Sequence, residues 1–187
     1  QTTKFRRVAI STLSGFSCET VSNIVTVTVR PVVTAGQIGT DQTICNGTTP
    51  NAILSVIDGT GVGTITYYWE KSINGGASWS IVSGQTGSGL ILPSLTQTTM
   101  YRRYTIASLG GLDCNSSATV AVTIIVQTIP TAGSIDLNQT ICNGTAPSLF
   151  TSLTNGTGNI GATISYEWWQ STNGVTWSQI PAANSAT

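Results

Sequence analysis

Apolar and polar residues alternate in short runs along most of the chain. Between positions 64 and 71, Ile65, Tyr67 and Trp69 fall on one face of an extended backbone, and the residues between them fall on the other. This two-residue period is typical of a strand that buries one face. No stretch has the 3.6-residue period of an amphipathic helix.

The alternating runs are short and are separated by turn sequences such as Ser14-Gly15 and Asn74-Gly75-Gly76. We expect strands over residues 3–10, 24–29, 32–38, 42–45, 52–57, 64–71, 79–82, 90–92, 100–107 and 119–126. Short strands about ten residues apart are typical of an antiparallel β-sandwich. The predicted fold class is therefore all-β.

One heptapeptide occurs twice in the chain. Residues 42–48 read QTICNGT, and the same seven letters return at residues 139–145, which is 97 positions later. Residues 97–103 (QTTMYRR) similarly repeat residues 1–7 (QTTKFRR), 96 positions apart. The sequence is therefore a tandem repeat, and we expect its function to be that of an array of similar domains.

The repeat has one inserted residue. Cys114 follows Cys18 by 96 positions, whereas Val122 follows Val25 by 97 positions. An insertion between positions 114 and 122 explains the change and keeps the apolar residues of the next strand in register.

The repeat divides the chain into three parts. Residues 31–129 form a complete repeat, residues 1–30 the C-terminal part of a preceding repeat, and residues 130–187 the N-terminal part of a following one. We expect the chain to be a piece of a longer array. Pro31 and Pro130 mark the boundaries, because proline cannot join a central strand ladder. The linkers are short and lack a glycine run, so neighbouring domains should have restricted freedom.

Two aromatic features sharpen the prediction to tandem immunoglobulin-like or fibronectin-like sandwiches. Trp69 is the inward tryptophan that such folds place in the third main strand, and Trp168 is its counterpart in the next repeat. Leu95 and Tyr101 have the spacing of a tyrosine corner, in which the tyrosine hydroxyl bonds to the backbone. We therefore expect Trp69, Trp168 and Tyr101 in the cores.

Composition argues against several classes of function. Only 7% of the residues are charged and the net charge is zero, so nothing suggests binding to nucleic acid or to anionic lipid. No apolar run approaches the roughly 20 residues of a membrane helix, so we expect no direct membrane insertion.

Enzymatic motifs are missing from the sequence. The chain has no histidine, which excludes Ser-His and Cys-His pairs and histidine metal sites. The seven acidic residues are scattered, and no two form a carboxylate dyad or a calcium loop. We expect no enzyme activity and no catalytic, cofactor or metal site.

The four cysteines, Cys18, Cys45, Cys114 and Cys142, are expected to form structural disulfides, which indicates an extracellular protein. The favoured bond, Cys45–Cys114, would close a loop of about 70 residues and stabilise the repeat by about 4 kcal/mol. A regular immunoglobulin topology places these two turns at opposite ends of the domain, too far apart for an S–S bond. Either the first strand is split and rerouted, or the bond joins neighbouring repeats.

Adjacent arginines occur in the strand over residues 100–107. Arg102 should point outward, where it can pair across strands with Glu70. Arg103 should point inward, so it must stack on an aromatic ring such as Trp69, or a bulge must turn it out.

Three further tryptophans are candidates for a binding platform. Trp79 and Trp177 follow Asn-Gly turns, and Trp169 has the outward parity of its strand. Exposed aromatic rings can hold sugar rings, but Trp79 and Trp177 are better explained as caps on the core. Trp169 is the better candidate for exposure.

These residues resemble a known family. The QTICNGT element, the QTT-x-(Tyr/Phe)-RR strand and the Tyr-x-Trp strand look like the Ig-like repeats of giant surface proteins of gliding Bacteroidetes, such as the SprB-like motility adhesins. The resemblance spans the whole chain. It implies export by the type IX secretion system, attachment at the outer membrane, and a role in cell adhesion or gliding motility.

The expected function is therefore structural: a stalk or spacer repeat in a long surface adhesin or filament. Its expected partners are neighbouring repeats of the same chain, with surface polysaccharide and other filaments as further candidates. The alternative is a carbohydrate-binding module that uses its exposed tryptophans.

Overall fold

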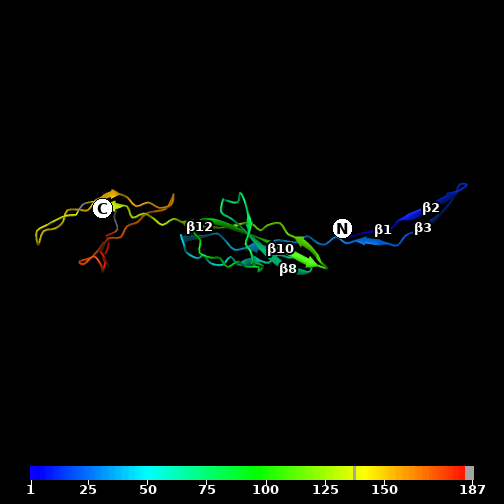
Figure 1. Cartoon of the computed structure of the whole chain (residues 1–187), viewed down its shortest axis with the longest axis horizontal. Helices are drawn as coiled ribbons and strands as arrows, with labels where there is room; N and C mark the ends of the chain where they lie inside the picture. The colour runs from blue at the N-terminus through cyan, green and yellow to red at the C-terminus, as the bar shows by residue number, and fades with distance from the viewer. Residues whose placement is uncertain (137, 184–187) are drawn as a thin grey trace. The chain divides into compact units, whose positions relative to one another are not determined.

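The structure is a computed structural model that describes residues 1–136 and 138–183 (Figure 1). All regular secondary structure in this part of the chain is β, as the sequence predicts, and it contains no helix able to cross a membrane. The strands are β1 Thr3–Phe5, β2 Val8–Leu13, β3 Phe16–Val21, β4 Val25–Val27, β5 Gln37–Ile38, β6 Gln42–Cys45, β7 Ser55–Ile57, β8 Thr64–Ser72, β9 Ser80–Ile81, β10 Thr99–Leu109, β11 Leu112–Asn115, β12 Val122–Gln127, β13 Ser134–Ile135, β14 Ser152–Thr154, β15 Trp169–Gln170 and β16 Ser178–Gln179.

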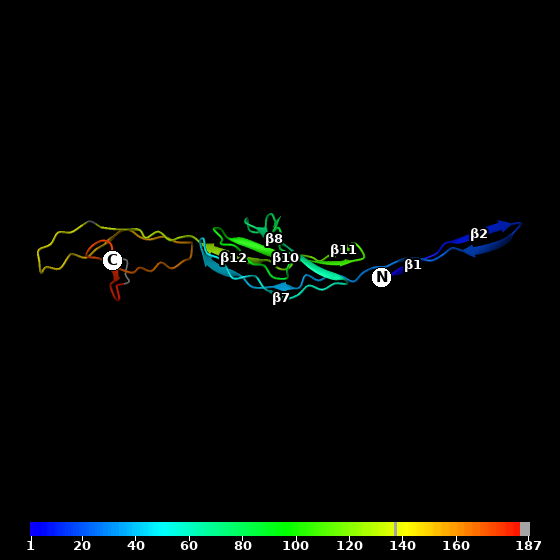
Figure 2. The same cartoon turned by 60° about the horizontal axis from the view of Figure 1, so that its bottom comes forward.

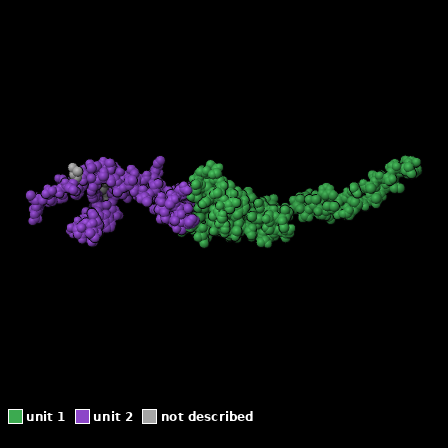
Figure 3. All heavy atoms as spheres, in the orientation of Figure 1, with its two compact units in different colours: residues 1–41, 51–92, 99–123 green, residues 42–50, 93–98, 124–187 purple. Residues whose placement is uncertain are grey.

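The chain divides into two compact units, coloured separately in Figure 3. The first unit comprises residues 1–41, 51–92 and 99–123, and the second comprises residues 42–50, 93–98 and 124–187. The boundary passes through β12, whose first two residues belong to the first unit.

The largest sheet has the strand order β6-β12-β10-β8-β9, with β11 paired to β10. Its longest pairing is antiparallel and joins β8 to β10, from Ser72 opposite Met100 to Thr64 opposite Ser108. β6 runs parallel to β12, with Gln42 opposite Ile124. Buried and less buried side chains alternate along β10 and β12. The buried face of β12 is apolar, whereas that of β10 includes the polar residues Thr99, Arg103 and Thr105.

A second, smaller layer consists of β5 and β7, which are paired antiparallel and drawn apart from β8 and β10 in Figure 2. Isolated bridges extend it, between Thr34 and Thr60 and between Ile53 and Leu90. The segment expected as a first strand is therefore split, because β5 pairs with β7 whereas β6 pairs with β12.

Buried side chains concentrate around β8 and β10. Trp69 and Tyr101 are 0% and 3% exposed. The remaining buried apolar residues are Val33, Ile53, Leu90, Leu92, Ala107 and Val122 in the first unit, and Ile124 and Val126 in the second. Trp168, the counterpart of Trp69, is only partly buried and stacks on Phe150 at a ring distance of 6.0 Å.

The strands expected from the sequence do not include β3, β11 or the four short strands β13 to β16. Of these, β3 and β11 form matching hairpins. β2 and β3 place Ser11 opposite Cys18, and β10 and β11 place Ala107 opposite Cys114. The turn sequences SG and GG, at positions 14–15 and 110–111, adopt positive φ and reverse the chain. These turns were the available signal for the extra strands.

The two units repeat the same pairings at the 97-residue spacing. The bridge between Thr34 and Thr60 recurs between Thr131 and Thr157, and the two hydroxyl contacts measure 2.8 and 2.7 Å. The pairing of β5 with β7 recurs in β13 and β14, with the same irregularity in register. The sequence repeat therefore corresponds to a structural repeat in these segments.

The expected disulfides are not formed. Cys18, Cys45, Cys114 and Cys142 are all free thiols. Strand register gives each of the first three a non-cysteine partner: Ser11, Gln127 and Ala107, respectively. The Cys45–Cys114 bond favoured from the sequence is thus absent, because pairing partners far along the chain, rather than cysteine spacing, decide where each thiol lies.

The expected tyrosine corner is also incomplete. Among the described residues, the Tyr101 hydroxyl makes no hydrogen bond to the backbone, although its ring is buried. Leu95 instead pairs through its own backbone with the turn after β6: its N–H donates to Thr48 O and its carbonyl accepts from Gly47 N.

Candidate functional site

The two adjacent arginines of β10 lie on opposite faces of the sheet. Arg102 is opposite Glu70 and Arg103 is opposite Trp69 in the pairing with β8. Arg103 is 0% exposed, whereas Arg102 is partly exposed. Strand geometry alone dictates this opposition, because successive side chains of a strand point to opposite sides. The predicted orientations of both arginines are confirmed.

Arg103 donates four hydrogen bonds inside the first unit. Its Nη1 donates to Ser55 Oγ at 2.8 Å and to Ser88 O at 2.6 Å. Its Nη2 donates to Ala35 O at 2.9 Å and to Ile57 O at 3.1 Å. Since Ser55 and Ile57 belong to β7, the guanidinium ties β10 to the second layer. Among the described groups, Nε has no partner.

Aromatic rings complete the environment of Arg103. The guanidinium carbon lies 4.6 Å from the centre of the Tyr67 ring and 5.9 Å from that of Trp69, as expected for cation–π contacts. Burial lowers the pKa of Arg103, and the charges of Tyr67 and Asp58 partly oppose that shift. Arginine remains charged at neutral pH, so the site holds a buried cation that is satisfied mainly by neutral oxygens.

The outer face of β8 and β10 carries a second cluster. Arg102 forms an ion pair with Glu70, with Nη2 to Oε2 at 2.6 Å, and its guanidinium lies 4.0 Å from the centre of the Trp79 ring. Trp79 also donates from Nε1 to Gly76 O at 3.0 Å. The predicted Arg102–Glu70 pair is confirmed, and Trp79 is held against the sheet.

Two tyrosines extend this outer cluster along the sheet. Tyr68 and Tyr104 are directly opposite each other and stack with ring centres 4.6 Å apart and planes 3° apart. Burial raises the pKa of both, and mutual charge repulsion and the nearby Glu70 carboxylate raise the pKa of Tyr68 further. The phenols therefore stay neutral at physiological pH, and this face offers stacked rings, not an acid–base pair.

The three candidate platform tryptophans differ in exposure. Trp79 is partly buried beneath Arg102, whereas Trp169 and Trp177 are 50% and 56% exposed. Trp169 lies on β15, and Trp177 directly precedes β16. The described part of the chain contains no group of three or more side chains placed to hold a metal ion.

The acceptors of Arg103 could not be found from the sequence. Three of them are backbone carbonyls, at Ala35, Ile57 and Ser88, and any residue type supplies such a group. The fourth, Ser55, is 48 residues away and is one serine among many. Only the tertiary arrangement brings these oxygens together.

Comparison with known proteins gives one family. A family model described as "Domain of unknown function (DUF8696)" matches residues 34–128 and again residues 131–187. No curated protein and no solved structure matches the chain.

Proposed function

The chain belongs to the DUF8696 family, a domain of unknown function, and we propose that it is a run of immunoglobulin-like β-sandwich repeats acting as a stalk or spacer. The main support is that equivalent strand pairings recur 97 residues apart: the bridge between Thr34 and Thr60 has its counterpart between Thr131 and Thr157. An array of such domains fixes the distance between the two ends of the stalk and resists being stretched. We place it in a long surface adhesin or filament of the outer membrane, with a role in adhesion or gliding.

The strand arrangement supports an immunoglobulin-like topology. Its first strand is divided between two layers, one half pairing antiparallel with β7 and the other parallel with β12. The buried Trp69 on β8 has the place of the inward tryptophan of such sandwiches. The two stretches matched by the family model agree with the proposed boundaries near residues 31, 129 and 130.

The junctions between repeats support a mechanical role. Arg30 donates from Nη1 to Leu112 O at 2.7 Å and from Nη2 to Val62 O at 2.9 Å. Around the second boundary, Asn159 Oδ1 accepts from the N–H and the hydroxyl of Thr128, at 2.9 and 2.5 Å. Each linker is therefore hydrogen-bonded to the repeat that follows it: Arg30 to β11 and to the loop before β8, and Thr128 to Asn159.

Single-molecule stretching of this chain tests the mechanical role. We expect residues 31–129 to resist force and then open in one cooperative step that releases about 30 nm of contour length, since an extended residue spans about 3.4 Å. Gradual lengthening without a force peak would contradict the proposal. An antibody against the chain should also label intact cells of the source organism, which tests the surface location separately.

Carbohydrate binding is a second proposal, favoured by the exposure of Trp169 and Trp177. A glycan array should then show binding that falls at least about tenfold in Trp169→Ala, because stacked aromatic rings supply most of such contacts. Trp79→Ala is the matched control, since Trp79 is already covered by Arg102. Equal glycan binding by the unsubstituted chain, Trp169→Ala and Trp79→Ala would contradict carbohydrate binding through Trp169.

A further inference from the structure

The chain enters the largest sheet of the complete repeat through β6 and leaves it through β12. These two strands lie side by side and run parallel, with Gln42 opposite Ile124 and Cys45 opposite Gln127. β12 then continues directly into the linker to the next repeat. Tension along the chain therefore reaches this sheet at Gln42 and leaves it at Gln127, which lie at opposite ends of the parallel pair.

Loading at opposite ends pulls β6 and β12 along their length. Parallel strands are joined by evenly spaced hydrogen bonds, so this shear strains all the bonds together instead of one after another. β8 and β10 have the longest pairing of the sheet, but both lie in the part of the chain between β6 and β12. They therefore bear little tension until β6 and β12 separate. β5 pairs with β7 over only two residues and with an irregular register, so we expect it to yield first.

A side chain extends the parallel pair at the point where the chain enters it. Asp41 directly precedes β6, and its Oδ1 accepts a hydrogen bond from the N–H of Thr123 at 2.7 Å. Thr123 directly precedes Ile124, the first residue of β12 that pairs with β6. A carboxylate acceptor makes this bond charge-assisted. Asp41 thus joins the two strands one position beyond their backbone pairing.

The turn after β6 fastens the other end of the strand. The N–H of Asn46 donates to Gln127 O at 2.9 Å, beside the last paired residue of β12. The N–H of Gly47 donates to Leu95 O at 2.8 Å, and the N–H of Leu95 donates to Thr48 O at 3.1 Å. β6 is therefore held by hydrogen bonds from the residue before it to the turn after it.

We propose that β6, its pairing with β12 and the flanking bonds of Asp41 and residues 46–48 form a mechanical clamp that sets the resistance of the complete repeat to stretching. The clamp rests on the proposed function, since it matters only in a chain that carries load, and it locates where that load is borne. Resistance to force and overall stability then depend on different residues, because the Arg103 site joins β10 to β7 and shares no residue with the clamp.

Asp41→Ala and Arg102→Ala form a matched pair for stretching at constant force, since each removes one charged side chain from a site at least partly exposed to water. We expect Asp41→Ala to shorten the lifetime of the folded repeat at least about fivefold, because one hydrogen bond of the clamp is lost. Arg102→Ala should shorten it less than about twofold, because its bond joins β10 to β8 and stays intact while the clamp opens. Asp41→Asn keeps an oxygen acceptor and should also stay within about twofold of the unsubstituted chain.

Urea unfolding of the same variants shows whether the lifetime under force simply follows stability. A shorter lifetime in Asp41→Ala alone, at similar stability of Asp41→Ala and Arg102→Ala, supports the clamp. Equal shortening by these two substitutions, or none by either, would overturn the clamp but leave the mechanical role standing, since a force peak remains. The absence of any force peak would contradict both.

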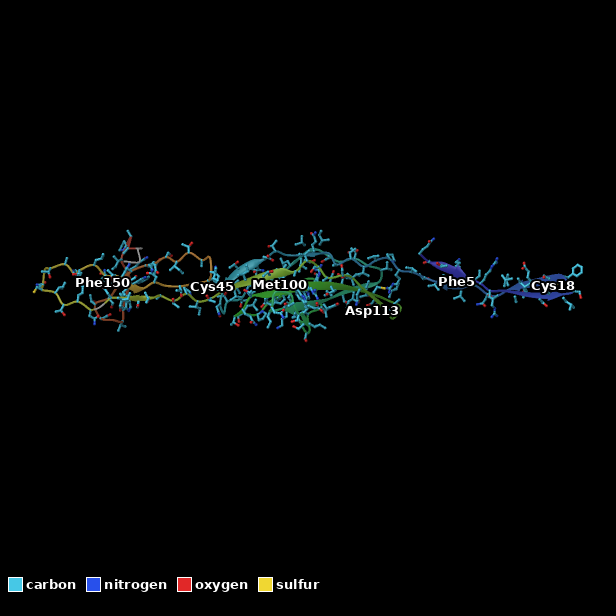
Figure 4. All side chains as sticks on the ribbon, turned by 90° about the horizontal axis from the view of Figure 1, so that it is seen from above. Phe5, Cys18, Cys45, Met100, Asp113 and Phe150 are labelled. Carbon is cyan, nitrogen blue, oxygen red and sulfur yellow. The ribbon has the colours of Figure 1, made fainter. Side chains whose placement is uncertain are left out.

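A cysteine substitution tests the register on which the clamp depends. Cys45, labelled in Figure 4, lies opposite Gln127, and both side chains are exposed. With the other three cysteines replaced by serine, Gln127→Cys should form a disulfide with Cys45 in oxidised glutathione, since strands about 4.8 Å apart suit an S–S bond. The bond should reduce the length released under force from about 30 nm to about 5 nm, because residues 46–126 are then bypassed.

Thr123→Cys is the control for this disulfide. Thr123 lies four residues, or about 13 Å, along β12 from Gln127, so we expect its thiol and that of Cys45 to stay free. Free thiols in Gln127→Cys after the same treatment, or a disulfide formed equally well by Thr123→Cys, would refute the parallel register and with it the clamp.

Discussion

Arg103→Ala should lower the free energy of unfolding of the complete repeat by about 3–5 kcal/mol, the largest effect we expect from a single side chain. The substitution removes the guanidinium that bonds Ser55, Ser88, Ala35 and Ile57, and it leaves these partly buried acceptors without their donor. It also empties the space beside the Tyr67 ring. Urea unfolding followed by circular dichroism measures the loss.

Arg102→Ala is the matched control for this experiment. It removes the same side chain one position earlier, from the outer face, where the ion pair with Glu70 is partly exposed to water. We expect a loss of about 1 kcal/mol from the ion pair and the contact with Trp79. Equal losses for the two arginines would show that the buried site does not tie the layers together.

Arg103→Lys separates charge from geometry at the same position. A lysine ammonium keeps the positive charge but has three donors on one atom, so it cannot reach acceptors spread around a planar fork. We expect a loss close to that of Arg103→Ala. Retention of full stability by the lysine variant would mean that charge alone, rather than the arrangement of four hydrogen bonds, accounts for the contribution of Arg103.

Gly36→Ala should destabilise the repeat by about 3 kcal/mol or more, for a backbone reason. Gly36 has φ of +70°, which is unfavourable for any residue with a Cβ. A Cβ there would also collide with the carbonyl oxygen of Ile57 on β7. The clash involves two backbone segments, so no side-chain rotation relieves it. Thermal or urea unfolding detects the change.

Gly47→Ala controls for the conformational part of that cost. Gly47 has φ of +79°, but an added Cβ would meet nothing within 4 Å. We expect a loss of about 1 kcal/mol from the positive φ alone. The difference between the two variants isolates the clash. The same contrast recurs in the following repeat between Gly133, whose Cβ would strike Thr154 O, and Gly144, which is open.

Local geometry made some features predictable from the sequence. Alternating residues identified the strands around Trp69 and placed Arg102 and Arg103 on opposite faces, because the two-residue period of a strand is a property of the backbone itself. The 97-residue repeat was visible in the sequence, and the structure shows equivalent bridges at that spacing, at Thr34 and Thr131, because equal sequences take up equal local structure. The hairpins ending in β3 and β11 were missed, although their glycine turns were visible.

Features that depend on contacts between residues far apart in the chain could not be predicted from local sequence patterns. Cysteine spacing suggested a Cys45–Cys114 bond, but strand register places Gln127 and Ala107 opposite these residues. The sequence also required a partner for the inward Arg103 without identifying its oxygen acceptors.

The amino-acid order thus determined an all-β repeat, its spacing and the inward direction of Arg103. The division of the first strand between β7 and β12, the free thiols and the buried cation site were decided only by the tertiary structure. The physical reason is that backbone geometry fixes where a side chain points. What that side chain meets depends on which distant strands pair, and neither residue type nor spacing encodes this pairing locally.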